Sequence, residues 1–104
     1  MQTHQIVLGL NIPNSGTVTN QMWMQFVQDE LLTRLQFCTI SDAIGVYKGT
    51  LEKTKIIEVT VDERTTHSDQ IVNNLKKVGD VYKQQFRQDC VLYRFTNVEE
   101  LVLA

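Results

Sequence analysis

The hydrophobic periodicity of this chain switches between the spacing of a strand and that of a helix, and it repeats the same order twice. Residues 5–12 (QIVLGLNI) place every second side chain on one apolar face, as a half-buried strand does. From Asn20 the apolar residues recur at spacings of three and four, which predicts a helix. Its buried face would consist of Trp23, Phe26, Val27, Leu31 and Leu35.

The rest of the chain continues this alternation of elements. Residues 37–49 (FCTISDAIGVYKG) predict an irregular strand, 50–54 (TLEKT) a polar turn, and 55–63 (KIIEVTVDE) a regular strand. A second helix is expected over 68–86, followed by a strand over 89–98. The apolar stripe of the second helix is formed by Ile71, Leu75, Val78, Tyr82 and Phe86.

The order β-α-β, β-α-β defines the expected fold. Residues 1–104 are predicted to form a single α+β domain of the ferredoxin-like type, with a four-stranded antiparallel sheet and both helices on one face. Thr19 and Ser68 are the expected N-caps of the helices. Gly79 should let the second helix pack close to the sheet. The tail at 99–104 would extend the last strand or form a short further one.

Two helices on one face leave the other face of the sheet bare, and the sequence does not make that face uniformly polar. Val7 and Ile56 fall on it. One of two sets from the last strand must also point there, either Val91, Tyr93 and Phe95 or Cys90, Leu92 and Arg94. An exposed apolar patch of this kind marks an interface or a ligand groove. We therefore expect a homodimer or a higher homo-oligomer.

Composition narrows the function classes. A formal net charge of -2 argues against a nucleic-acid polymer as partner. No apolar run is long enough to span a bilayer, and the N-terminus lacks the features of a signal peptide. Cys38 and Cys90 lie in apolar runs, as buried thiols of a cytoplasmic protein do. His4 and His67 have no Cys or carboxylate at metal-ligand spacing, so no metal or other cofactor is expected.

Three stretches resemble a known family in order and spacing. They are LGLNIP with GTVTNQMWMQFVQDELLTR, then TISDAIGVYKG, and finally YKQQFRQDCVLYR. Together they cover residues 8–94 and resemble the domain of unknown function 3574 family. The chain departs from that family's pattern at Tyr47, Arg87 and Cys90, where Trp, Gly and Ser are usual. The family has no established activity, so the resemblance supports the fold more than the function.

The resemblance also draws attention to DAIGVYKG at residues 42–49. Asp42, Arg34 and Gln88 match family positions, and Tyr47 keeps an aromatic side chain at its position. Helix ends lie near the following strands in this fold. These four residues form our candidate ligand site, with Tyr82 and Arg94 as outer contributors. The alternative is structural: a salt bridge between Asp42 and Arg34, with Tyr47 covering the core. In the same stretch, Gly45 is expected either to bend the strand or to allow a close approach to its backbone.

Three functions are compatible with these features of the sequence. The first is a non-catalytic module that binds a small polar or anionic ligand, by analogy with phage counter-defence proteins that sequester nucleotides. The second is a cofactor-independent monooxygenase-like or isomerase-like enzyme, which lacks an obvious base here. The third is a protein-interaction subunit that uses the bare sheet face and the tail at 99–104. We favour the binding module over an enzyme.

Overall fold

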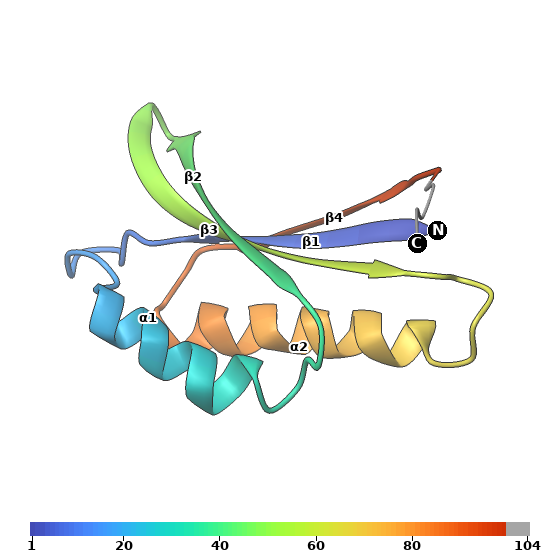
Figure 1. Cartoon of the computed structure of the whole chain (residues 1–104). Helices are drawn as coiled ribbons and strands as arrows, with labels where there is room; N and C mark the ends of the chain where they lie inside the picture. Colours follow the sequence, from blue (N-terminus) through green and yellow to red (C-terminus); the bar gives the residue numbers. More distant parts are fainter. Residues whose placement is uncertain (100–104) are drawn as a thin grey trace.

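The computed structural model describes residues 1–99 of the chain. Its elements follow the predicted order (Figure 1). They are β1 (Gln2–Gly9), α1 (Asn20–Phe26), the π-helical turn η1 (Val27–Leu31), β2 (Thr39–Tyr47), β3 (Thr50–Val61), α2 (Ser68–Gln85) and β4 (Leu92–Asn97). The expected strand extension at 99–104 lies outside the described residues, apart from Glu99.

The four strands form one sheet in the order β2-β3-β1-β4, and every neighbouring pair is antiparallel. Figure 1 shows α1 and α2 packed side by side beneath this sheet. The predicted α+β architecture with two helices and a four-stranded antiparallel sheet is therefore confirmed. Within residues 1–99 no helix covers the opposite face, which we call the open face. No helix in this part of the chain is long and apolar enough to cross a membrane.

The core lies between the sheet and the helices, as the two apolar stripes predict. Every residue of the first stripe is buried, and so are Leu75, Val78, Tyr82 and Phe86 of the second. The sheet contributes Ile6, Leu8, Ile57 and Val59 to the same cluster. The aromatic rings pack on one another, with 5.8 Å between the centroids of Trp23 and Phe26 and 5.3 Å between those of Phe26 and Tyr82. Burial of these large rings supplies much of the hydrophobic stabilisation.

The predicted turn at residues 50–54 is wrong. The chain reverses at Lys48 and Gly49, which have φ of 50° and 77°, and 50–54 are already part of β3. Two successive residues with positive φ match the right-handed twist of a tight hairpin, and glycine adopts this conformation without strain. The polar composition of TLEKT reflects solvent exposure of a strand rather than a loop. The sequence prediction placed the start of β3 five residues too late.

Moving the turn lengthens the hairpin, so that it extends beyond the rest of the sheet. The last pair between β1 and β3 is Gly9 with Thr54. Residues 44–53 therefore form a two-stranded segment with no third strand, which we call the hairpin arm. In Figure 1 the arm curves away from the helices and rises over the open face. The arm and the sheet together line the pocket described below.

The register shows no β-bulge at Gly45, because β2 pairs with β3 without a break from Thr39 to Tyr47, although the arm that contains Gly45 is curved (Figure 1). A Cβ atom added at Gly45 would lie 3.7 Å from the Thr54 methyl group, which is ordinary van der Waals contact. Continuous pairing therefore rules out a bulge at this glycine and not a gradual bend of the strand. Open space beside the backbone remains, and it belongs to the pocket described below.

The expected N-cap at Thr19 is confirmed, since its hydroxyl accepts a hydrogen bond from the backbone N–H of Met22 at 3.2 Å. The expected N-cap at Ser68 is wrong. Ser68 is the first residue of α2, its hydroxyl donates to the Thr65 carbonyl, and His67 occupies the cap position. Gly79 is buried, and a Cβ there would lie 3.4 Å from a Val91 methyl group. The helix thus packs closely at this glycine, as predicted.

Candidate functional site

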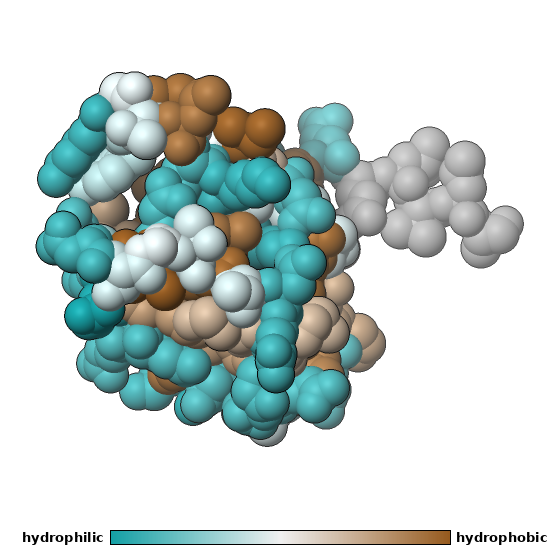
Figure 2. Space-filling model, turned by 90° about the vertical axis from the view of Figure 1, so that its left-hand side faces the viewer, coloured by the Kyte–Doolittle hydropathy of each residue, from teal (hydrophilic) through white to brown (hydrophobic). Residues whose placement is uncertain are grey.

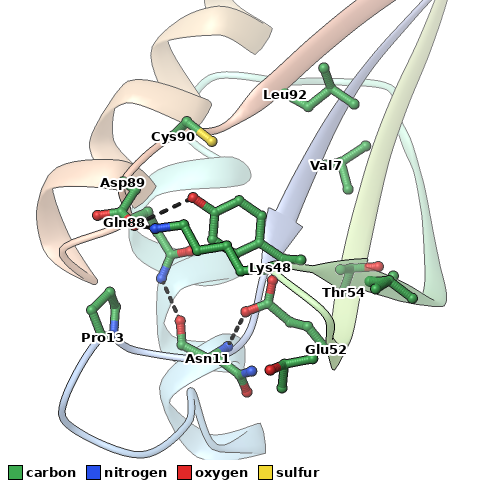
Figure 3. Close-up of a pocket in the computed structure, with 15 residues that line it drawn as sticks. Val7, Asn11, Pro13, Lys48, Glu52, Thr54, Gln88, Asp89, Cys90 and Leu92 are labelled. Atoms are coloured by element: carbon green, nitrogen blue, oxygen red, sulfur yellow. Dashed lines mark hydrogen bonds and ion pairs between the residues drawn. The ribbon is translucent and has the colours of Figure 1, made fainter.

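A pocket of about 480 Å³ opens on the open face, where the hairpin arm rises over the sheet (Figure 3). Alternation along each strand determines which side chains line it, since every second residue points to the same face. The strands contribute Val7, Gly9, Gly45, Val46, Tyr47, Thr50, Glu52, Thr54 and Leu92, and the connections contribute Asn11, Pro13, Lys48, Gln88, Asp89 and Cys90. The bare face predicted from the sequence is therefore where the structure has a cavity.

Glu52 lies over the backbone of Gly9, one strand away. A Cβ at Gly9 would collide with the Glu52 carboxylate, so the absence of a side chain at Gly9 creates the space that this group occupies. One carboxylate oxygen accepts a hydrogen bond from the backbone N–H of Asn11 at 3.1 Å. Glu52 is thus held in one orientation with part of its acceptor capacity left over, since a carboxylate can accept several hydrogen bonds.

Tyr82 supports the same backbone segment from the helical side. Its phenol is fully buried and donates a hydrogen bond to the Gly9 carbonyl. Burial raises the pKa of Tyr82, and the nearby Glu52 carboxylate raises it further. Since both effects favour the neutral phenol, Tyr82 keeps its proton and acts as a donor. Gly9 is therefore held between a tyrosine below the sheet and a carboxylate above it.

Two further contacts connect the rim of the pocket. The Gln88 side-chain amide donates to the Asn11 carbonyl at 2.8 Å, which ties the α2–β4 connection to the end of β1. The Tyr47 hydroxyl lies 3.4 Å from Asp89 Oδ2, and the Lys48 ammonium lies 3.8 Å from the same oxygen. The tip of the hairpin arm thus approaches the α2–β4 connection through long, solvent-exposed contacts.

The pocket combines apolar walls with negative charge. Val7 and Leu92 supply hydrocarbon surface, while Glu52 and Asp89 supply two carboxylates against the single cation Lys48. Lys48 is 74% exposed and already faces Asp89. Because opposite charges attract most strongly where water is partly excluded, this lining favours a cationic or zwitterionic ligand over an anion.

The six residues proposed from the sequence do not lie in one place. Tyr47 and Gln88 line the pocket, and Tyr82 contacts its floor through Gly9. Arg94 lies on the open face, outside the pocket, where its side chain donates to Gln5. Arg34 and Asp42 lie away from this pocket. The first candidate site is thus divided among three regions of the molecule.

The alternative salt bridge between Asp42 and Arg34 is wrong. Arg34 pairs with Glu30 at 2.5 Å, one helical turn earlier, and Asp42 pairs with Lys55 across the β2–β3 ladder. Both pairs are local consequences of helix and strand geometry, in which residues four apart or directly opposite are neighbours. Tyr47 does not cover the core either, because it is 44% exposed at the arm.

Sequence reasoning missed Gly9, Asn11, Glu52 and Asp89. The sequence pattern places Glu52 in a turn, so it predicts no strand partner for this residue. In the observed register Glu52 lies opposite Gly45. Gly49 was the available signal, because glycine between two strand-like runs favours the second position of a two-residue hairpin. With that turn in place, alternation puts Glu52 on the same face as Val7.

A second, more polar hollow lies at the other end of the sheet, beside the start of α2. His4 is buried there, with Nδ1 2.5 Å from the Tyr93 hydroxyl and Nε2 3.1 Å from Gln2 Oε1. Burial lowers the pKa of His4, and the Lys76 ammonium lowers it further. Because the Gln2 oxygen accepts, Nε2 carries the proton and Nδ1 accepts from Tyr93. His4 is therefore a satisfied structural histidine.

The described residues contain no cluster of three or more His, Cys, Asp or Glu side chains that could hold a metal ion.

Fold and site together define a small α+β protein with a charged pocket on the open face of its sheet. The chain belongs to the family described as "Protein of unknown function (DUF3574)", whose model matches residues 3–100. This confirms the resemblance seen in the sequence. No curated protein matches the chain.

Solved structures of phage SAM lyase share the fold. The apo form aligns with a TM-score of 0.67 at 22% identity, over 91% of this chain and 78% of the other. The complex with S-methyl-5'-thioadenosine aligns with a TM-score of 0.63 at 19% identity, over 91% of this chain and 79% of the other. At this identity the similarity establishes a common fold.

Proposed function

We propose that this protein binds a small compound of the S-adenosylmethionine type in the pocket beneath the hairpin arm. The observation that carries the proposal is the Glu52 carboxylate, held over Gly9 inside a cavity with apolar walls. The cavity volume falls within the roughly 300–1,000 Å³ of ordinary small-molecule sites. The shared fold with phage SAM lyases, one of them bound to S-methyl-5'-thioadenosine, supports this choice of ligand.

The chemistry of the pocket suits each part of such a ligand. The sulfonium of S-adenosylmethionine carries a positive charge on an apolar framework, which matches carboxylates set among hydrocarbon side chains. Gly45 leaves backbone surface uncovered, so a flat purine can approach it closely. Thr50 and Thr54 offer hydroxyls for polar edges. We therefore keep the expectation of a small polar ligand and replace the expected anionic character with a cationic or zwitterionic one.

Binding without turnover, and so sequestration of the ligand, is the function that we favour. Cleavage is the second candidate, since the neighbours are named lyases and Glu52 supplies a carboxylate near the ligand. Breaking the bond between the sulfonium sulfur and the γ-carbon of the amino-acid chain leaves the electron pair on sulfur and releases a neutral thioether, while the α-carboxylate of the same molecule bonds to that carbon and closes a lactone. Incubation with S-adenosylmethionine distinguishes the two, because only cleavage by the protein produces S-methyl-5'-thioadenosine faster than buffer alone does.

Isothermal titration with S-adenosylhomocysteine, a stable analogue, tests the proposal. We expect one site per chain in the parent protein and a loss of binding in Gly45→Val. The new side chain would project into the pocket, while its Cβ meets the Thr54 methyl at an ordinary 3.7 Å. Valine is also favoured in strands, so the melting temperature should not fall. Ile44→Val, at the neighbouring exposed position, is the control. Undiminished binding by Gly45→Val would show that the ligand lies elsewhere.

We also propose that the fold is of the ferredoxin-like type and that the chain forms a homodimer or a higher homo-oligomer. Read from β4, the strand order is 4-1-3-2, as in a split β-α-β arrangement. Figure 2 shows hydrophobic side chains gathered at the top of the view, over the hairpin arm. Ile44, Val46 and Leu51 are each at least 70% exposed there, and β2 is an edge strand with an unpaired side. Such edges favour pairing with a second copy.

Sedimentation equilibrium tests self-association. At micromolar concentration we expect a mass of at least twice the 12.0 kDa of one chain. Leu51→Glu places a charge on the exposed apolar surface of the arm and should shift the protein toward monomer. Thr66→Glu, in an exposed loop, is the matched control and should leave the mass unchanged. A parent protein that sediments as 12.0 kDa would refute the proposal.

A further inference from the structure

A row of polar side chains crosses the open face next to the pocket. Arg94 Nε donates to Gln5 Oε1 at 2.6 Å, and Gln5 Nε2 donates to Glu58 Oε1 at 2.6 Å. These residues are direct neighbours on β4, β1 and β3, since Gln5 is opposite Arg94 on one side and Glu58 on the other. The central glutamine therefore holds a cation and an anion on the two sides of one strand.

The two charges of this row are not neutralised within the described part of the chain. Neither Arg94 nor Glu58 takes part in any ion pair among residues 1–99. The guanidinium uses one of its five N–H groups for Gln5. Its planar fork, which can bind a carboxylate through two hydrogen bonds, is left over. Glu58 likewise keeps acceptor capacity beyond its contact with Gln5.

The row lies beside the pocket, two residues further along the strands. Val7 and Leu92 line the pocket, and each is two residues from a member of the row. Residues two apart on a strand point to the same face at a separation of about 6.6 Å. Val7, Leu92 and Ile56 thus form an apolar strip that leads from the pocket to the opposite charges.

We propose that Arg94 and Glu58 bind the amino-acid end of the ligand, with Arg94 on its α-carboxylate and Glu58 on its α-ammonium. The inference rests on the proposed function and names the part of the ligand that lies outside the pocket. An α-amino acid group presents the complementary pair of charges on one carbon. The short aliphatic chain between its α-carbon and the sulfur would lie on the apolar strip. Gln5 is then a positioning residue that fixes both charged groups.

Two probes that differ in the amino-acid end test this directly by isothermal titration. S-adenosylhomocysteine carries that end, whereas S-methyl-5'-thioadenosine lacks it. The parent protein should bind the first about tenfold more tightly, since charged hydrogen bonds at a partly exposed site contribute on this order. Arg94→Gln and Glu58→Gln should each remove most of this difference and leave the affinity for S-methyl-5'-thioadenosine unchanged. Lys77→Gln, an exposed charge change on α2, should alter neither affinity.

The possible outcomes distinguish a failure of this inference from a failure of the proposed function on which it rests. If both probes bind equally, or if the two variants leave the tenfold preference intact, the amino-acid site is wrong and the proposed function stands. If Arg94→Gln and Glu58→Gln weaken both probes alike, the row acts through the structure of the sheet, and the inference is again overturned. If the parent protein binds neither probe nor S-adenosylmethionine itself, the proposed function fails and the inference fails with it.

Discussion

Trp23→Ala is expected to lower the free energy of unfolding by about 3–5 kcal/mol, the range for truncation of a large buried aromatic side chain. The indole is 5% exposed and packs between Phe26 and Tyr82, with ring centroids 5.8 Å and 6.4 Å away. Its removal leaves a cavity that neighbouring rings cannot fill. Because small domains have total stabilities of about 5–15 kcal/mol, this variant should unfold far more easily in urea.

The matched control is Met24→Ala in the same helix. Met24 is 53% exposed, so its truncation should change the unfolding midpoint little. A Trp23→Ala protein that unfolds at the same urea concentration as the parent would show that α1 does not bury this face. The packing of Trp23 against Tyr82 in the core would then be contradicted as well.

Glu52→Gln is expected to weaken binding of S-adenosylmethionine about 10- to 100-fold, because it removes a negative charge whose attraction to the sulfonium is about 1–4 kcal/mol at contact distance. The substitution keeps the side-chain volume, and its amide oxygen can still accept from the Asn11 N–H. The loss should therefore appear in the dissociation constant rather than in the melting temperature. Binding measured by equilibrium dialysis, with thermal unfolding in parallel, separates the two effects.

Asp80→Asn supplies the control for a simple change in net charge, because Asp80 is exposed on α2 and away from the pocket. It should bind S-adenosylmethionine as the parent does. If Glu52→Gln binds with unchanged affinity, the carboxylate does not contact the ligand. If Asp80→Asn weakens binding equally, the effect is one of overall charge, and the specific role of Glu52 is contradicted.

The helices and the main faces of the sheet could be predicted because each depends on local periodicity. Trp23 and Leu31 in α1, and Leu75 and Tyr82 in α2, are buried as their spacing indicates. The hairpin could not be placed in this way, since the polar residues at 50–54 have the composition of a turn and the geometry of a strand. Strand pairing depends on where the turn lies, so one misplaced turn changed the partner of every residue in the arm.

The site was harder to predict than the fold because it depends on that register. Tyr47 and Gln88 were found through a resemblance in sequence, and both line the pocket. Arg34 and Asp42 were chosen on the same grounds, but they do not pair with each other. Arg34 pairs with Glu30, and Asp42 pairs with Lys55. The Glu30–Arg34 pair has the i, i+4 spacing of a helical ion pair and could have been recognised in the sequence. The contact of Glu52 with Gly9 could not have been recognised in the sequence, since it joins two separate strands.

The most direct test of the account is to locate the ligand on the protein. In a ¹H–¹⁵N correlation spectrum titrated with S-adenosylhomocysteine, we expect the largest shifts at the amides of Gly9, Asn11, Gly45 and Glu52, which surround the pocket on three elements. The amides of Asn73 and Lys76, beside the polar hollow at the other end of the sheet, should not move. Shifts confined to that hollow, or a spectrum unchanged at millimolar ligand, would contradict the claim that the open-face pocket binds this class of compound.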